Sequence, residues 1–255
     1  MDKRGAAAAG WHPHGLAIRD YLAGDRAAAV TAHRSDGLRY DIPAAVFFRA
    51  PGRFDPLERA ALARCRGRVL DAGAGAGCHS LALQARGLSV CALDVAPQAV
   101  AAMRRRGVQE AVRGDVLRYR GGPFDTLLLL MNGIALVKSL PGLARFLKRA
   151  RRLVRPGGQV LLDSLDLRRD DWSRAEALRR RRTGRRYFGV LGFRLEYRGR
   201  LGPGFHLLFI DPATLARHAA RAGWDCQVIK TGAQGRFLAR LTPKPIQTRA
   251  ARAPR

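Results

Sequence analysis

A glycine-rich turn between a short apolar strand and a helix constrains this fold more than any other feature. The segment Val69–Gly77 reads Val-Leu-Asp-Ala-Gly-Ala-Gly-Ala-Gly, with a glycine at every second position of its last five residues. Glycine lets the backbone turn tightly and lets a ligand approach where a Cβ would clash. The helix predicted from about Cys78 offers free N–H groups in its first turn. The segment therefore predicts an α/β domain that binds a ligand at the end of this strand.

The spacing of the glycines argues against the usual dinucleotide fingerprint. The third glycine, Gly77, comes one position earlier than in the pattern GxGxxG. An acid, Asp71, also precedes the first glycine by two residues. An acid at this point suits a ligand that presents an ammonium group better than one that presents a pyrophosphate.

Strands and helices alternate on both sides of this turn. Apolar strands are predicted at Val69–Ala72, Ser89–Leu93, Ala111–Arg113, Phe124–Met131 and Gln159–Asp163. Helices are predicted at about Asp55–Cys65, Cys78–Ala85, from Pro97 onwards and at Leu143–Val154. Asp55 and Glu58 have the spacing of a capping box. This alternation indicates a parallel sheet with helices on both faces.

The flanks of this core follow other patterns. A helix is predicted at about Gly15–Thr31, followed by a polar turn at Ser35-Asp36-Gly37. A polar helix is predicted at Asp170–Arg182, two or three antiparallel strands within Tyr187–Ile210, and then a helix from Asp211-Pro212 to Gly223 with two closing strands, Cys226–Lys230 and Arg236–Leu241. The predicted division is an N-terminal helical or lid segment (1–54), a domain (55–242) with an insert at about 168–210, and a disordered basic tail (243–255).

With these motifs in order, the chain resembles the class I S-adenosylmethionine-dependent methyltransferases. Val69–Gly77 matches the first motif of that family, and Leu153–Gly158 matches its turn before the fifth strand. Asp94, Gly114-Asp115 and Phe124–Met131 stand at the ends of the second and third strands and along the fourth. The resemblance covers about residues 54–241. It implies a Rossmann-like three-layer α/β sandwich whose mostly parallel seven-stranded sheet has an antiparallel last strand, with a small antiparallel β insert.

The resemblance also implies the cofactor, S-adenosylmethionine, and the residues that hold it. In the family an acid at the position of Asp94 holds both ribose hydroxyls, and one at the position of Asp115 faces the adenine amino group. The expected cofactor-binding residues are Asp71, Gly73, Gly75, Gly77, Asp94, Val95, Asp115, Val116, Met131 and Asn132. The methyl group is already electrophilic, so the protein mainly holds donor and acceptor in line.

The residues for the acceptor are less well marked. Asn132 is the first candidate, either beside the donor methyl or as a polar end to a buried strand; it lacks the Pro-Pro-aromatic sequence typical of base N-methylation. His206 and Asp211 are candidates for a base. Arg49 is either a clamp on an acidic substrate or a solvated arginine, and His79 either touches the cofactor or packs at the sheet edge. His12, His14 and Tyr21 lie in the predicted lid segment.

The charge leaves a choice of partner open. The chain of 255 residues has 47 Lys+Arg and 20 Asp+Glu, and 42 of the basic residues are Arg. The run Arg179–Arg186, which precedes Tyr187 and Phe188, either grips RNA phosphates or is a solvated surface loop. An Ala- and Gly-rich chain with so much arginine also has the composition that a GC-rich genome produces.

The favoured hypothesis is methyl transfer to a small molecule, and acidic molecules are among the acceptors that it covers. The alternatives are methylation of RNA or of a ribosome-associated target, and a catalytically silent relative that only binds the cofactor. The longest apolar run, Thr126–Val137, is too short to span a membrane. The four cysteines form no CxxC pair and no zinc-site spacing, so no metal is expected and the chain is predicted to be cytoplasmic.

Overall fold

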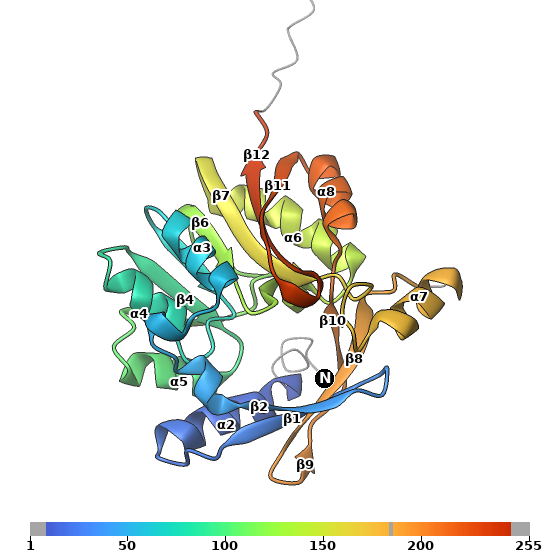
Figure 1. Ribbon diagram of the computed structural model, residues 1–255. Helices are drawn as coiled ribbons and strands as arrows, with labels where there is room; N and C mark the ends of the chain where they lie inside the picture. The colour runs from blue at the N-terminus through green and yellow to red at the C-terminus, as the bar shows by residue number, and fades with distance from the viewer. Residues whose placement is uncertain (1–8, 184–185, 246–255) are drawn as a thin grey trace, which may run out of the picture.

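The computed structural model describes residues 9–183 and 186–245, and its larger sheet has seven strands in the order β11-β12-β7-β6-β3-β4-β5 (Figure 1). In that order the strands are Trp224–Thr231, Arg236–Pro243, Val154–Leu165, Phe124–Leu129, Val69–Ala72, Val90–Asp94 and Glu110–Arg113. The five strands from β7 to β5 are parallel, and β12 is antiparallel to both β7 and β11. The predicted mostly parallel sheet with an antiparallel last strand is confirmed.

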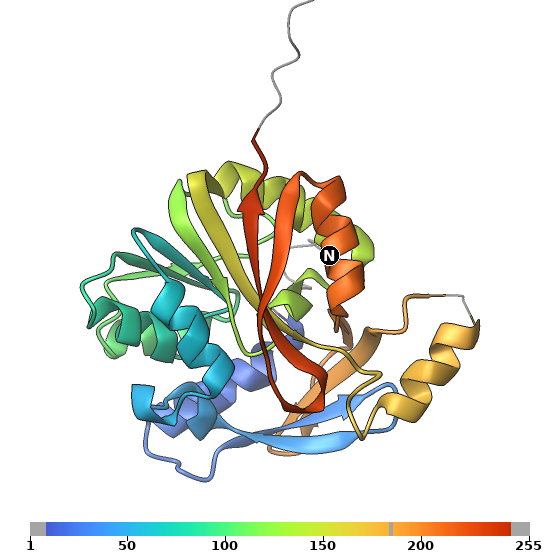
Figure 2. The ribbon, with the colours of Figure 1, turned by 45° about the horizontal axis from the view of Figure 1, so that its top comes forward.

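Helices cover both faces of this sheet, as predicted from the alternation of strands and helices (Figures 1 and 2). One face carries α3 (Pro56–Arg64), α4 (Cys78–Gln84) and α5 (Pro97–Arg105), and the other carries α6 (Leu140–Leu153) and α8 (Pro212–Arg221). Neighbouring residues of β3 enter opposite cores, since Val69 packs with α3 and α4 while Leu70 packs with α6. Burial on both faces explains the continuous apolar sequence of the central strands.

Local capping fixes where several of these helices begin. The Asp55 carboxylate accepts hydrogen bonds from the N–H groups of Leu57 and Glu58, and the Glu58 carboxylate accepts one from the Asp55 N–H, so the predicted capping box is confirmed. Asp211 caps α8 by accepting from the Thr214 N–H. Both helices have proline at their first position, where no N–H partner is lost.

A second, antiparallel sheet joins the hairpin at residues 29–43 to the strands at residues 190–208. Its main strands are β1 (Ala29–Arg34), β2 (Arg39–Pro43), β8 (Val190–Tyr197) and β10 (Phe205–Leu208), in the order β10-β8-β1-β2, with the short β9 (Arg200–Leu201) paired to β8. The predicted antiparallel strands of the insert are confirmed. Their pairing with the N-terminal hairpin was not predicted.

The prediction of a helix over Gly15–Thr31 is wrong in its second half. The helix α2 covers His12–Leu22, and Gly24, with φ +116°, follows it before β1 starts at Ala29. The alanine-rich sequence favours a helix by propensity, but pairing of Ala32 with Tyr40 and Leu195 places this segment in a sheet. Thus the N-terminal segment is not only helical.

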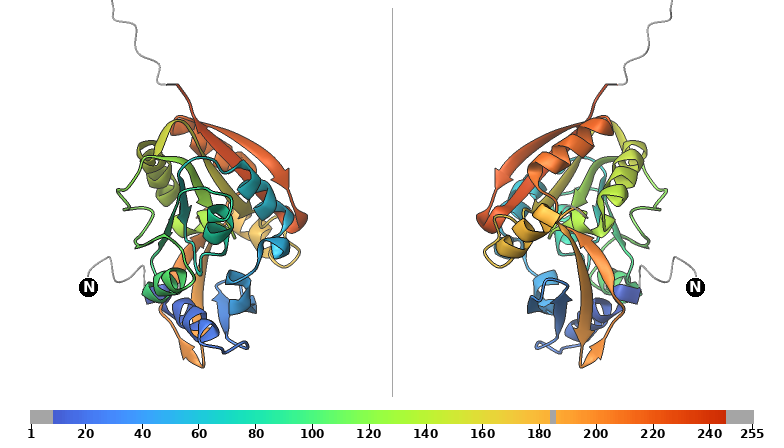
Figure 3. Two further views of the ribbon diagram at one scale, coloured as in Figure 1. Left: turned by 90° about the vertical axis from the view of Figure 1, so that its left-hand side faces the viewer. Right: turned by 90° about the vertical axis from the view of Figure 1, so that its right-hand side faces the viewer.

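The small sheet and α2 lie beyond the carboxyl ends of the parallel strands, on one side of the molecule (Figures 1 and 3). The helix α2 packs against α5, β8 and η1 (Ala44–Phe47). Short 3-10 helices also occur at η2 (Pro51–Arg53), η3 (Gly133–Val137) and η4 (Ala233–Gly235). The small sheet and α2 therefore cover the end of the large sheet at which the glycine turn lies.

The remaining segments are peripheral. The polar helix α7 (Arg174–Thr183) starts four residues later than predicted and projects from the body of the molecule (Figure 2). Of the predicted tail, Pro243 ends β12 and the Lys244 N–H donates to the Gly223 carbonyl; positions 246–255 lie outside the described residues, as do Gly184 and Arg185. Among the described helices, none is long and apolar enough to cross a membrane.

Candidate functional site

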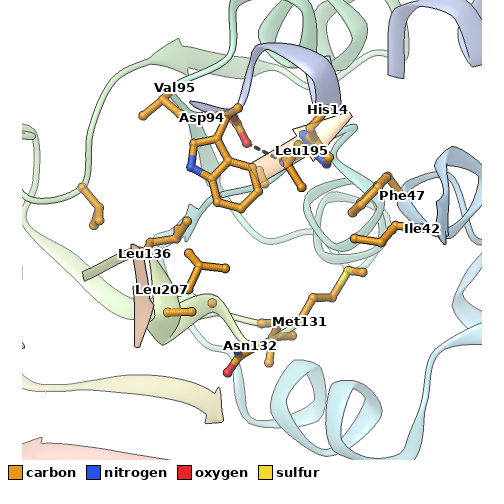
Figure 4. Close-up of a pocket in the computed structure, with 18 of the residues that line it drawn as sticks. His14, Ile42, Phe47, Asp94, Val95, Met131, Asn132, Leu136, Leu195 and Leu207 are labelled. Atoms are coloured by element: carbon orange, nitrogen blue, oxygen red, sulfur yellow. Dashed lines mark hydrogen bonds between the residues drawn. The ribbon is translucent and has the colours of Figure 1, made fainter. Parts of the chain in front are cut away.

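A cavity of about 300 Å³ lies between the carboxyl edge of the large sheet and the small sheet (Figure 4). We call its two walls the floor and the roof. The floor consists of Asp71, Gly73, Ala74, Gly75, Asp94, Val95, Gly114, Asp115, Val116, Met131 and Asn132. The roof consists of Val30, Ala32, Tyr40, Ile42, Phe193, Leu195, Phe205 and Leu207. The floor lies where the strand order reverses between β3 and β6, the usual ligand site of open α/β sheets.

The glycine turn of the floor requires glycine for two different reasons. Gly73, Gly75 and Gly77 have φ of +78°, +57° and +79°, which L side chains rarely adopt. A Cβ on Gly73 would lie 2.7 Å from Leu136 Cδ1, whereas a Cβ on Gly75 would face the cavity, with the Phe47 ring 3.6 Å away as its nearest neighbour. Gly73 thus allows close packing, and Gly75 leaves room for a ligand.

Two buried carboxylates hold the shape of this turn. Asp71 accepts a hydrogen bond of 2.6 Å from the Ser80 hydroxyl, and burial raises the pKa of its carboxyl. Asp94 accepts from the N–H groups of Gly75 and Ala96, each at 2.9 Å. Burial raises the pKa of Asp94 to about 6, although those N–H groups favour the charged form. A buried carboxylate with hydrogen-bonding capacity to spare is a strong acceptor for ligand hydroxyl or ammonium groups.

The end of β6 carries backbone strain and an unpartnered oxygen. Met131 and Asn132 both have φ of +59°, two consecutive left-handed residues of which neither is glycine. The Asn132 Oδ1 atom is buried and has no hydrogen-bond partner within the described part of the chain. Next to it, the Gly133 N–H donates to the buried Asp163 at 3.2 Å. Strain of this kind is typical of functional sites.

The roof is apolar because of strand alternation. Inward residues are in register across the sheet, with Val30 opposite Ile42, Ala32 opposite Leu195, and Phe193 opposite Phe205. The residues between them are polar and face outward, where His33 meets Glu196 at 2.7 Å and Thr31 meets Asp41 at 2.6 Å. One face of the sheet therefore presents a continuous hydrocarbon surface to the cavity.

A buried imidazole, His14, completes the cavity at the side of α2. Its ring lies edge-on to Phe47, with centroids 4.5 Å apart, and to Trp11, with centroids 5.7 Å apart. Burial lowers the pKa of His14 to about 4, so the ring is neutral at physiological pH. Figure 4 shows it at the rim between the floor and the roof.

A triad centred on the buried Glu58 joins the loop after β2 to α3 and α4. Arg49 donates to both carboxylate oxygens of Glu58, at 2.6 and 3.1 Å, and His79 Nε2 lies 2.8 Å from the same carboxylate. Burial alone would raise the pKa of Glu58, but the hydrogen bonds from His79, the Asp55 N–H and Arg49 outweigh it and lower this pKa to about 2. The charge of Arg49 is therefore already neutralised within the protein.

Comparison with known proteins decides the family. Residues 69–158 match a family described as a methyltransferase domain. A crystal structure of an S-adenosylmethionine-dependent methyltransferase from Bacteroides fragilis, in complex with S-adenosylhomocysteine, is 36% identical; the match covers 93% of this chain and 97% of that one, with a TM-score of 0.82. This chain is an S-adenosylmethionine-dependent methyltransferase. It belongs to class I of these enzymes, as its sheet order shows.

Curated relatives match the methyltransferase over a shorter stretch. A protein named ubiquinone biosynthesis O-methyltransferase from Pseudomonas aeruginosa is 32% identical over 117 residues, which are 43% of this chain and 48% of that protein. One of the same name from Xylella fastidiosa is 28% identical over 107 residues, 39% of this chain and 42% of that protein. The methyltransferase thus matches less than half the length of these relatives.

The fold brings most of the predicted cofactor residues of the methyltransferase into one floor. Nine of the ten come from the ends of four adjacent strands and line the cavity, namely Asp71, Gly73, Gly75, Asp94, Val95, Asp115, Val116, Met131 and Asn132. Gly77 lies just behind, where a Cβ would be 2.9 Å from Val108. Asp115 accepts a hydrogen bond from the Leu117 N–H, which orients its carboxylate.

Five predicted acceptor or lid residues do not line this cavity, namely His12, Tyr21, Arg49, His206 and Asp211. His206 alternates with Phe205 and Leu207 on β10, so it points to the outer face of the roof. Asp211 caps α8 and accepts from the Tyr187 hydroxyl at 2.7 Å. Tyr21 contacts Phe48 ring to ring, with centroids 4.6 Å apart, and does not line the cavity.

The roof of the methyltransferase was missed by sequence reasoning. Its signal was present, since Val30 and Ala32 alternate with polar residues before the turn at Ser35-Asp36-Gly37, and Tyr40 and Ile42 do so after it. That is the pattern of a β-hairpin with one apolar face. Pairing of this hairpin with β8, about 160 residues later, left no local trace.

Proposed function

We propose that this methyltransferase transfers a methyl group to the oxygen of a small-molecule acceptor inside the cavity. The observation that carries this proposal is that one cavity of about 300 Å³ has both a polar floor and an apolar roof. That volume suits a small ligand and leaves no room for a folded macromolecule. The curated relatives, whose name is O-methyltransferase, support oxygen as the methylated atom.

The residues of the floor fit S-adenosylmethionine. Gly75 leaves its Cβ position open to the cavity, Asn132 Oδ1 is an unused acceptor, and the two carboxylates of Asp71 and Asp94 provide negative charge for a cationic ligand with hydroxyl groups. In our proposal Asp94 and Val95 hold the ribose, Asp115 and Val116 hold the adenine, and the turn from Asp71 to Gly77 together with Met131 and Asn132 holds the methionine part. The bound cofactor supplies an electrophilic methyl group.

The chain contributes position and exclusion of water. The floor fixes the donor, and the hydrocarbon surface of the roof orients the acceptor and keeps water away from the reacting atoms. Fixing two reactants in line supplies much of the rate of such a displacement. On this proposal residues 55–242 are the catalytic domain, and the described parts of the segments 1–54 and 168–210 cover its cavity.

The geometry gives less support to the other two acceptor hypotheses. Arg49, the predicted clamp for an acidic acceptor, does not line the cavity and is paired with Glu58 behind Met131, which leaves Lys138 as the cation among the described lining residues. RNA would need basic residues at the site, but the described arginines of the run 179–186 lie on and after α7 and do not line the cavity.

Calorimetric titration tests the cofactor part of this proposal. The protein should bind S-adenosylhomocysteine and S-adenosylmethionine at micromolar concentration and should not bind NAD. Labelled methyl transfer should then appear in a pool of small metabolites and not in total RNA. Transfer to RNA that weakens steeply with salt would overturn the choice of acceptor.

A further inference from the structure

The chemistry of the roof defines the acceptor more closely than its size does. Eight roof residues from four strands present side chains of Val, Ala, Ile, Leu, Phe and Tyr, and the backbone groups between them are paired within the sheet. Against the roof, a charged or heavily hydroxylated part of an acceptor would lose its hydration without gaining partners, which costs several kcal/mol. A planar apolar molecule would instead gain from contact with Phe193, Phe205 and the Phe47 ring.

The ionisable groups of the cavity differ in what they are free to do. On the floor side, Asp71 is bonded to Ser80, Asp94 to two N–H groups, Asp115 to the Leu117 N–H, and His79 to Glu58. Lys138, also at the cavity, can only donate. Cys78 and Tyr40 also line the cavity, and burial raises the pKa of each, so both stay protonated; the remaining ionisable group is His14. His14 makes no side-chain hydrogen bond to any part of residues 9–183 or 186–245, so its ring nitrogens are available to a ligand.

The position of His14 places it between the two walls. It projects from α2, whose next residue, Gly15, lies so close to α5 that a Cβ there would be 3.3 Å from Ala96, two residues after Asp94. Its ring touches Phe47, which in turn is the nearest neighbour of the open Cβ position of Gly75. The contacts with Phe47 and Trp11 fix the ring edge-on, so the imidazole has a defined direction.

We propose that the acceptor is an uncharged, planar aromatic molecule with a hydroxyl group, and that His14 accepts the proton of that hydroxyl during methyl transfer. This inference rests on the proposed function. In the step, a bond forms between the acceptor oxygen and the methyl carbon, the carbon–sulfur bond breaks with its electron pair left on sulfur, and the O–H proton moves to a ring nitrogen of His14. The proton later leaves to solvent.

Two physical reasons make a weakly basic imidazole sufficient. The oxygen becomes far more acidic as the new bond forms, so the proton can move late to a base whose pKa burial has lowered to about 4. The charge of the cavity also stays constant, because a positive charge disappears from sulfur as another appears on His14. A change of net charge in a closed apolar cavity would be costly.

The test compares His14→Gln with wild type on phenols of graded acidity, from 4-methoxyphenol through phenol and 4-cyanophenol to 4-nitrophenol. Glutamine can hold a hydroxyl but cannot take its proton. We expect kcat to fall about 10²–10³-fold for the least acidic phenols and progressively less for the more acidic ones, which need less help from a base. Binding of S-adenosylhomocysteine, measured by calorimetry, should change less than about threefold.

Controls separate this role from a structural one. His12→Gln changes an exposed histidine two residues earlier on the same helix, outside the cavity, and should behave as wild type. His14→Phe keeps a ring between Phe47 and Trp11, should fold, and should show the same dependence on phenol acidity as His14→Gln. Thermal melting of each variant reports folding.

Each outcome bears on a different statement. An equal loss for all phenols, or no loss, would overturn the role of His14. Wild-type transfer to polar metabolites and to none of the phenols would overturn the aromatic acceptor while leaving the proposed function intact. Failure of the wild type to bind S-adenosylhomocysteine would overturn the proposed function and this inference with it.

Discussion

The floor and the roof of the cavity are built by opposite rules. The floor is polar and comes from one continuous stretch, residues 71–132, in which each site residue lies at the carboxyl end of a strand or in the turn after it. The roof is apolar and comes from segments about 160 residues apart, joined only by pairing such as Ala32 with Leu195. The contrast indicates that donor binding is set by local turns, whereas acceptor recognition depends on long-range assembly. Substitutions can test this division.

Disruption of the triad of Arg49, Glu58 and His79 should give the largest effect on stability. Glu58→Ala leaves the buried His79 and the partly buried Arg49 cation without their carboxylate, and should lower the free energy of unfolding by about 3–5 kcal/mol in urea titrations. The matched control is Glu176→Ala, which removes an exposed partner of Arg179 and should change little. Equal effects of the two variants would show that the triad contributes no more than a surface pair.

The same triad predicts how the stability of the protein responds to acid. Because the pKa of Glu58 is lowered to about 2 in the folded protein, its contribution is complete above the unfolded value near 4.5 and is lost as pH falls toward 2. The shift corresponds to about 3 kcal/mol. Wild type should therefore lose more stability between pH 5 and pH 2 than Glu58→Gln does, and parallel curves would contradict this.

A bulky residue in the glycine turn should break the floor without touching the roof. Gly73→Val requires a β-branched residue at φ +78° and puts its Cβ 2.7 Å from Leu136. We expect the affinity for S-adenosylhomocysteine to fall at least about 100-fold by calorimetry, or about 3 kcal/mol. Gly37→Ala tests positive φ alone, since Gly37 has φ +90° in the open hairpin turn of the roof, and it should leave that affinity unchanged.

Asp94→Asn should separate binding from stability. Loss of the charge should weaken S-adenosylhomocysteine binding about 10- to 100-fold, because hydrogen bonds to charged groups contribute about 1.5–3 kcal/mol. The folded pKa of about 6 exceeds the unfolded value, so the carboxyl group favours the folded state less as pH rises from 4 to 6. Without ligand, the free energy of unfolding of the variant should therefore rise by about 1–3 kcal/mol relative to that of wild type between pH 4 and pH 8. If the difference in the free energy of unfolding between variant and wild type is constant from pH 4 to pH 8, the raised pKa of Asp94 is refuted.

Shortening a roof side chain should affect the acceptor alone. Ile42→Ala removes hydrocarbon from the cavity wall and should lower kcat/KM for an aromatic acceptor about tenfold, or about 1–2 kcal/mol. Affinity for S-adenosylhomocysteine should stay within about twofold. Arg39→Ala, on the exposed part of the same strand and outside the cavity, is the control. A loss of cofactor affinity in Ile42→Ala would show that the two walls are not independent.

The smallest effect is expected on the exposed face of α7, outside the cavity. Arg181 and Arg182 are exposed on α7, and replacing both with alanine should change kcat/KM less than about twofold at any salt concentration. A large, salt-dependent loss of activity would revive the hypothesis of a nucleic-acid acceptor.

The sequence by itself determined the elements of the floor. The strand Val69–Ala72 and the capping box of Asp55 and Glu58 stand where they were predicted, because turns, caps and buried strands depend on neighbours in the chain. The carboxyl ends of parallel strands meet at one edge, so the order of motifs was enough to gather Asp71, Asp94 and Asp115.

Only the tertiary structure decided the rest. The alanine-rich residues after Gly24 favour a helix in isolation, and their pairing with β8 overrides that preference. His206 looked available in the sequence, but strand alternation turns it outward, while His14 on α2 faces the cavity. Arg49 looked like a free cation until Glu58, whose sequence role is only to cap a helix, proved to be its buried partner. Such roles arise from contacts between distant segments, and residue type and spacing do not encode those contacts locally.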